Sequence, residues 1–68
     1  MSFPMNALIE RSQQLVATFA KQAAGLDQLA DDSHEPERSY YLHKAKSMRY
    51  MIKNEEMRIK GLERVNVA

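Results

Sequence analysis

The sequence contains no cysteine and has only two glycines and two prolines among its 68 residues. Without cysteine, the chain cannot form a disulfide, a thiolate metal site or a catalytic thiol. A protein of strands and turns needs turn residues about every 8 to 12 positions, so the scarcity of glycine and proline argues against a β fold. The composition therefore predicts an all-α protein that is held together by side-chain packing.

Long apolar runs are also missing, since no stretch approaches the roughly 20 apolar residues of a membrane-spanning helix. Residues 1–6 lack the basic and apolar regions of a secretory signal. With 44% hydrophobic and 28% charged residues, the chain is too apolar to be a disordered tail. We expect one soluble, cytoplasmic domain that binds no membrane, with a thin core because so short a chain buries only about 60% of its unfolded surface.

The formal net charge is only +1, but it is divided unevenly along the chain. Residues 1–35 contain two basic and five acidic side chains, and residues 36–68 contain eight and four. The halves therefore carry net charges of −3 and +4 and attract each other. Surface ion pairs contribute only about 0 to 1 kcal/mol each, so this attraction favours a folded-back chain without driving its formation.

An apolar pattern with helical spacing covers residues 4–30. Ser2 is placed to cap this helix, and Pro4 fits its first turn. Gly25 costs roughly 1 kcal/mol relative to alanine, but Leu26 and Leu29 stay in phase, so we expect one continuous helix. Six of eight positions in the expected seam are apolar: Met5, Leu8, Ser12, Leu15, Phe19, Gln22, Leu26 and Leu29.

A second apolar row runs beside that seam. It consists of Ile9, Val16, Ala23 and Ala30. The two rows together are wider than the seam of a two-stranded coiled coil, which indicates that this helix faces more than one neighbour. The small residues Ala17, Ala20 and Ala24 run alongside and would let another helix approach closely.

The polar residues 31–35 interrupt the pattern, and Pro36 disfavours helical geometry at Glu35, so we expect a turn there. A second helix then covers residues 36–64, with Gly61 near its end and a loose tail at 65–68. Acidic residues near its start and basic residues near its end suit the helix dipole. Its seam is expected to be Tyr41, Ala45, Met48, Ile52, Glu55, Ile59 and Leu62, with Leu42 beside it.

Two long helices joined by a short link predict an antiparallel helical hairpin, residues 1–68 forming one domain. A hairpin covers only one side of each apolar stripe, and a domain this small is rarely stable alone. We therefore expect a homodimer in a four-helix arrangement with two-fold symmetry. The predicted core of the hairpin and its dimer is Leu8, Ile9, Leu15, Val16, Phe19, Leu26, Met48, Ile52, Ile59 and Leu62.

The second helix carries a further set of residues away from its seam, in which aromatic and methionine side chains are bordered by positive charge. Such a mixture is enriched at protein recognition sites. The alternative is that the tyrosines and methionine fill the dimer core or lie singly on the surface. The predicted partner-binding residues are Tyr40, His43, Arg49, Tyr50, Lys53 and Met57.

Basic residues within about 60° of one another on this helix allow a nucleic-acid-binding interpretation. They are Lys46, Arg49, Lys53, Lys60 and Arg64. Glu55, Glu56 and Glu63 dilute the charge, and no base-reading motif is present, so a solvated helix face is the simpler interpretation and nucleic acid a less favoured partner. A third possibility is a structural coiled-coil subunit of a larger assembly.

The sequence indicates neither an enzyme nor a cofactor-binding protein. His34 and His43 lack the spacing of a metal-ligand pair. The acidic residues around the turn lack the glycine and ligand pattern of a calcium loop. Ser33, His34 and Glu35 are sequence neighbours on an exposed turn, which cannot build a buried catalytic triad. We expect no catalytic residue, metal, cofactor or small-molecule substrate.

Three features together resemble a known family: a first helix over residues 5–29, an acidic turn over 31–36, and the segment Ser39-Tyr40-Tyr41-Leu42-His43-Lys44 opening a basic second helix. The chain is similar in length and layout to the small helical-hairpin anti-activators that bacteriophages encode, in particular the quorum-sensing anti-activators of Pseudomonas phages. The resemblance implies a dimer that binds a LuxR-type transcription regulator and blocks its DNA binding. It also implies the pilus assembly ATPase as a further partner.

Overall fold

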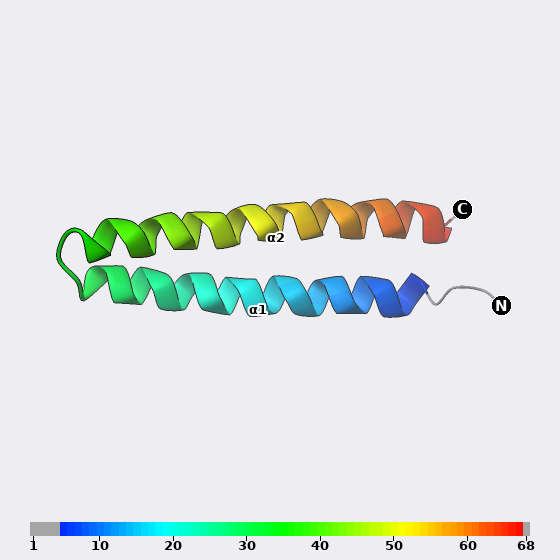
Figure 1. Ribbon diagram of the computed structural model, residues 1–68. Helices are drawn as coiled ribbons and strands as arrows, with labels where there is room; N and C mark the ends of the chain where they lie inside the picture. The colour runs from blue at the N-terminus through cyan, green and yellow to red at the C-terminus, as the bar shows by residue number, and fades with distance from the viewer. Residues whose placement is uncertain (1–4, 68) are drawn as a thin grey trace.

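The computed structural model describes the backbone of residues 5–67 and the side chains of residues 5–65. It contains two helices, α1 (Met5–Asp31) and α2 (Glu37–Val67). They lie side by side and antiparallel, so the start of α1 and the end of α2 are at the same end of the molecule (Figure 1). The hairpin is a rod of 53 × 14 × 14 Å. The predicted all-α helical hairpin is confirmed.

Helix α1 runs without a break through Gly25, as expected from the phase of the apolar residues on either side. At its end, the backbone N–H of Asp32 donates to the carbonyl oxygen of Gln28 at 3.1 Å. The hydroxyl of Ser33 donates to the carbonyl oxygen of Leu29 at 2.7 Å. These bonds satisfy carbonyl groups that a helix end otherwise leaves without a partner. The predicted cap at Ser2 and the helical position of Pro4 lie outside the described residues.

The connection between the helices contains residues 32–36 and ends with a cis peptide bond between Glu35 and Pro36. The hydroxyl of Ser39 donates to the Glu35 carboxylate, which ties the connection to the first turn of α2. Glu37 lies in the first turn of α2 and Arg64 near its end. A negative charge at the start of a helix and a positive charge at its end both interact favourably with the helix dipole, as the sequence predicts.

The C-terminus differs from the prediction of a helix that ends at Arg64. Helix α2 continues to Val67, so residues 65–67 are helical rather than a loose tail, and only Ala68 lies outside the description. Gly61 is inside the helix, and a Cβ atom there would meet no atom within 4 Å. A cost of roughly 1 kcal/mol at one glycine does not end a helix whose next residue, Leu62, remains half-buried in the seam.

The seam between the helices is lined most closely by small side chains. The four buried residues of the chain described by the structure are Ser12, Ala23, Ala30 and Ala45. The predicted seam positions of α2 are all buried or half-buried: Tyr41, Ala45, Met48, Ile52, Glu55, Ile59 and Leu62. Leu42, expected beside them, is 46% exposed. Small side chains at the contact allow two helices to approach closely.

On α1 six of the eight expected seam positions are buried or half-buried, and two are not. Gln22 and Leu29 are exposed, and Leu29 presents 47% of its surface. Their places are taken by Ala23 and Ala30, which belong to the second apolar row. The heptad spacing fits either row equally well. Both rows therefore contribute to the seam, and α1 is most deeply buried at its small residues Ser12, Ala23 and Ala30.

No large side chain is fully buried among the described residues. Ile9, Val16, Ile52 and Ile59 are each only half-buried. The core of a single hairpin is therefore as thin as its length predicts, and much of its apolar surface remains in contact with water.

Candidate functional site

The outer row of α2 points away from α1 and contains His43, Tyr50, Met57 and Arg64 at seven-residue spacing. Tyr50 is 68% exposed and Met57 is 63% exposed. Large apolar side chains with this much exposed surface are available for contact with another protein. We call these four residues the outer face of α2.

Tyr40, on the neighbouring row, is also exposed and has a defined surrounding. The Nζ atom of Lys44 lies 5.4 Å from the centre of its ring. The ring of Tyr41 meets it edge to face, with 5.6 Å between ring centres. A cation and an aromatic edge both suit the charge distribution of the tyrosine ring. Tyr40 is thus a side chain held in place beside a positive charge.

Arg49 was predicted to bind a partner, but it is engaged within the chain. Its guanidinium pairs with the carboxylate of Asp27 on α1 through two nitrogen atoms, with Nη1 3.4 Å from Oδ1 and Nη2 close to Oδ2. The hydrogen bond to Asp27 raises the pKa of Arg49 above its ordinary value, and the negative charge of the carboxylate adds to this. Sequence alone did not reveal this pairing because the two residues are 22 positions apart.

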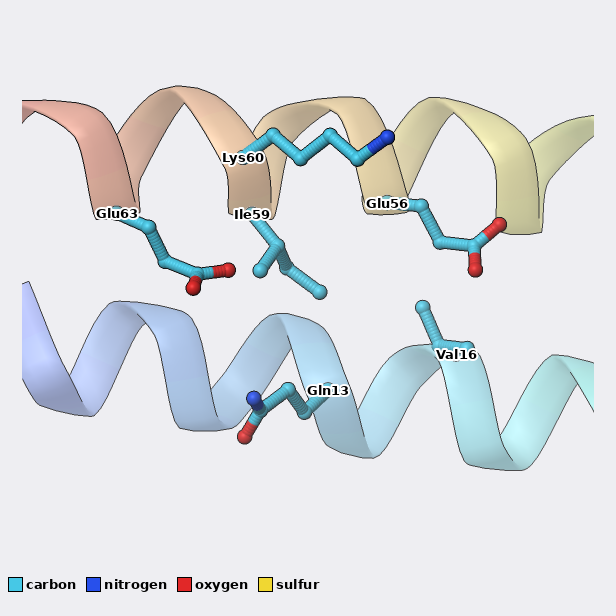
Figure 2. A pocket seen from close by; sticks show the side chains of 6 residues that line it. All are labelled: Gln13, Val16, Glu56, Ile59, Lys60 and Glu63. Carbon is cyan, nitrogen blue, oxygen red and sulfur yellow. The ribbon is translucent and has the colours of Figure 1, made fainter.

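The same side of the hairpin contains a groove of about 340 Å³ between the helices. In Figure 2, Val16 points from α1 toward α2, and Ile59, Glu56 and Glu63 point from α2 toward α1, where Gln13 lies. Lys60 lies along the rim. We call this side, with Asp27 and Arg49, the ion-pair face.

The basic row expected on α2 is real but mixed with acidic residues. Lys46, Lys53 and Lys60 follow one another at seven-residue spacing and are exposed. Glu56 and Glu63 share the groove with Lys60, and Arg49 is paired with an aspartate. A surface of alternating sign attracts a phosphate backbone less than a purely basic one.

The opposite side of the hairpin is more apolar and contains two further grooves. One, of about 440 Å³, is lined by Gln22, Gly25, Leu26, Leu29, Lys44 and Met48. The other, of about 290 Å³, is lined by Leu8, Arg11, Ser12, Leu15 and Arg58. Met51 and Val65 follow the same row of α2 as Lys44 and Arg58, at seven-residue intervals, and are 37% and 60% exposed. We call this side the leucine face.

Three basic side chains border the leucine face: Arg11, Lys44 and Arg58. None of them forms an ion pair with an acidic residue in the part of the chain that the structure describes. The sequence prediction did not include them because they are separated along the chain and come from both helices. Only the antiparallel packing brings Arg11 and Arg58 to one groove.

Glu55 is the one seam residue of α2 that carries a charge. Its Oε2 atom is buried and has no hydrogen-bond partner among the described residues. A buried carboxylate oxygen without a partner costs free energy, because the water it loses is not replaced. The sequence marks Glu55 as out of character in the seam, but it does not show that the oxygen lacks a partner.

The arrangement shows little that suits metal chemistry. Within the described residues, no group of three or more histidine, aspartate or glutamate side chains is close enough to hold a metal ion. No helix in that part of the chain is both long enough and apolar enough to cross a membrane.

The predicted partner-binding residues lie on three rows of α2. Tyr40 is on one row, and Arg49 and Lys53 lie toward the ion-pair face. His43, Tyr50 and Met57 lie on the outer face.

The hairpin therefore offers two kinds of exposed apolar surface, the outer face of α2 and the leucine face. No protein family, curated protein or solved structure matches this chain.

Proposed function

We propose that this chain is a non-enzymatic, cytoplasmic protein-binding inhibitor that acts as a homodimer of helical hairpins. The observation that carries the proposal is the absence of any fully buried large side chain within the described residues, combined with large apolar side chains on the outside. A chain that hides so little of its apolar surface by itself gains most by covering the rest with other protein surfaces.

Self-association uses the leucine face. Apolar side chains lie on this face along both helices. They are Leu8, Leu15 and Leu29 on α1, and Met51 and Val65 on α2. A second hairpin placed on this row creates a four-helix arrangement in which each surface meets its own equivalent. Burial of apolar surface contributes about 25 cal/mol per Å², so five such side chains from each copy provide a substantial driving force.

The client protein binds the outer face of α2. Tyr50 and Met57 have more than 60% of their surface exposed there, although α2 already uses its opposite side for the seam. Tyrosine and methionine are enriched at protein interfaces because they bring large contact areas, and tyrosine adds a polar group. The dimer presents this face twice, which permits binding to a symmetric client.

The resemblance to phage anti-activators suggests the client's class. A LuxR-type transcription regulator is the first candidate, and the pilus assembly ATPase is the second. Binding of the hairpin would cover the regulator's DNA-binding surface or its dimer interface and so prevent transcription activation. Nucleic acid takes second place as a partner because the lysine row is interrupted by acidic residues.

The test measures binding of a purified LuxR-type regulator to its operator DNA by fluorescence anisotropy, with increasing amounts of the hairpin. The native hairpin should release the DNA. Tyr50→Ala and Met57→Ala should each weaken this inhibition by about 5-fold to 150-fold, since truncating an interface anchor costs about 1 to 3 kcal/mol.

Lys21→Ala, on the exposed surface of α1, is the matched control and should inhibit like the native chain. Retention of helical circular dichroism shows that each variant still folds. If the regulator is released by the native hairpin and by both variants alike, the outer face of α2 is the wrong surface. If the native hairpin leaves the regulator on its DNA, this class of client is wrong.

A further inference from the structure

The first half of α2 carries positive charge that is largely unpaired. Residues 38–54 contain five lysines and arginines and no acidic residue. Of these five, Arg49 is paired with Asp27 of α1. Lys46 and Lys53 are exposed and form neither an ion pair nor a hydrogen bond within the part of the chain that the structure describes. Along about 25 Å of helix axis, positive charge is therefore left for a partner.

These two lysines lie beside the most exposed aromatic side chain among the described residues. Tyr50, which is 68% exposed, follows Lys46 by four residues and precedes Lys53 by three. Residues at these spacings are neighbours on a helix surface, so both lysines lie along one side of Tyr50. Its neighbours on the other side, Ser47 and Asn54, carry no charge. Tyr50 therefore combines apolar contact area with positive charge and has no acidic residue next to it.

On the basis of the proposed function, which places a client protein on the outer face of α2, we propose that the client docks there through an acidic amphipathic helix. Two carboxylates of that helix pair with Lys46 and Lys53, and the apolar side chains between them pack against Tyr50 and Met57. The positive charge of the surface selects the acidic partner, and the exposed tyrosine and methionine supply the contact area.

The spacing of the lysines specifies the spacing of the client's acids. Lys46 and Lys53 are seven residues apart, which is about 10.5 Å along the axis of α2. A client helix that lies alongside α2 presents acidic residues at the same interval when they are also seven apart. Tyr50 and Met57 share this interval, as do the apolar and charged positions of paired helices in coiled coils. The expected client segment thus has two acids seven residues apart with apolar residues between them.

Charge spacing favours a protein helix over nucleic acid. A nucleic-acid strand carries a phosphate about every 3.4 Å, whereas the lysine row offers one charge about every 10.5 Å. Beyond Lys53, Glu56 and Glu63 share a groove with Lys60, so a phosphate backbone that continues along α2 meets negative charge. A helix with two carboxylates opposite Lys46 and Lys53 avoids both glutamates.

Two synthetic helical peptides test this specificity by fluorescence anisotropy. The acidic peptide is built of alanine and glutamine and contains two glutamates seven residues apart, with leucines three and four positions after the first. In the basic peptide, lysine replaces both glutamates. The native hairpin should bind the acidic peptide about tenfold more tightly than the basic one or better, because like charges at an interface repel. Added salt should reduce this difference.

Charge-reversed variants locate the site. Lys46→Glu and Lys53→Glu should each weaken binding of the acidic peptide by about threefold to tenfold, and the variant with both changes should prefer the basic peptide. Lys21→Glu, on an exposed position of α1, is the matched control and should bind both peptides like the native chain. Retained helical circular dichroism shows that each variant still folds.

Three results would contradict the acidic specificity. The first is equal affinity of the native hairpin for both peptides, or binding of neither at hundreds of micromolar hairpin. The second is tighter binding of a labelled single-stranded oligothymidine than of the acidic peptide, which would favour nucleic acid as the partner. The third is a lower oligomeric state of Lys53→Glu than of the native chain in sedimentation equilibrium, which would show that a second copy occupies this face.

The regulator assay separates the acidic specificity from the proposed function. If Tyr50→Ala loses inhibition of the regulator while Lys46→Glu and Lys53→Glu retain it, the client binds the outer face of α2 without an acidic helix. If the native hairpin prefers the acidic peptide but leaves the regulator on its DNA, the acidic specificity stands and the class of client is wrong.

Discussion

At the residue scale, the smallest side chains decide how the hairpin packs. Ala23, Ala30 and Ala45 retain at most 2% of their surface, whereas every leucine and isoleucine of the seam keeps more. A small side chain at a helix contact shortens the distance between the helix axes, which depends on the residues at the contact. The consequence is a close hairpin whose larger apolar residues are pushed to its edges.

A substitution at Ala45 measures this close approach. Ala45→Leu should lower the free energy of unfolding by about 1 to 3 kcal/mol, because the added atoms have no space in a packed seam. Urea denaturation followed by circular dichroism at fixed protein concentration gives this value. Ala24→Leu, at an exposed position of α1, should change it by no more than about 0.5 kcal/mol. Equal effects at both positions would show that the helices are not in close contact at Ala45.

Arg49 shows a second effect at this scale. In the sequence it belongs to a basic, partner-seeking set, but the folded chain turns it toward Asp27. Both side chains remain about half exposed, so solvent and salt weaken the pair, and it contributes little to stability. The candidate client surface is consequently less basic than the sequence suggests.

At the element scale, both helices are longer than local signals require. Each contains one glycine in its interior, and each continues past it because the apolar residues that follow stay in the seam. Tertiary packing of one helix face commonly outweighs a single unfavourable residue. The energy lost at Gly25 and Gly61 is therefore recoverable by substitution.

Alanine at these positions should stabilise the protein. A Cβ atom at Gly25 or Gly61 would meet no atom within 4 Å, and neither residue has a positive φ. Gly61→Ala, which lies away from the leucine face, should raise the free energy of unfolding by about 0.4 to 1 kcal/mol, measured by urea denaturation. Gly25 lines a groove of the leucine face, so Gly25→Ala should give this gain only where no second copy covers that groove. The reverse change at a comparable exposed position, Ala24→Gly, should lower it by a similar amount. No gain from Gly61→Ala would indicate that α2 is not helical beyond that residue in solution.

At the scale of the whole molecule, a rod of 53 × 14 × 14 Å has too little interior for a full hydrophobic core. Only two helices contact each other, and the leucine face and the outer face of α2 are left with apolar residues in water. Small domains of this kind commonly reach stability by association when they lack disulfides or metals. In the proposed dimer, assembly and folding are coupled.

Coupling of this kind makes thermal stability depend on concentration. For a dimer of this size, a tenfold increase in protein concentration should raise the midpoint of thermal unfolding by about 5 °C. Circular dichroism melts from micromolar to hundreds of micromolar chain measure the change. Met51→Glu, which places a charge in the leucine face, should reduce this dependence, whereas Lys21→Ala should keep it. A midpoint independent of concentration in the native chain would show that the hairpin folds alone.

The sequence by itself determined the helical class, the position of the turn and the seam of α2. These depend on local signals, namely Pro36 and the spacing of apolar residues such as Met48, Ile52 and Ile59, which act within a few residues along the chain. Tertiary structure alone decided that Ala23 is buried and Leu29 exposed, because both satisfy the helical spacing of the apolar pattern and only contact with α2 separates them. It also decided that Arg49 forms an ion pair with Asp27 and that Arg11 and Arg58 line the same groove. The buried oxygen of Glu55, which has no hydrogen-bond donor among the described residues, is likewise a result of packing. Each of these depends on the antiparallel register of two helices, which residues far apart in sequence create only when they pack.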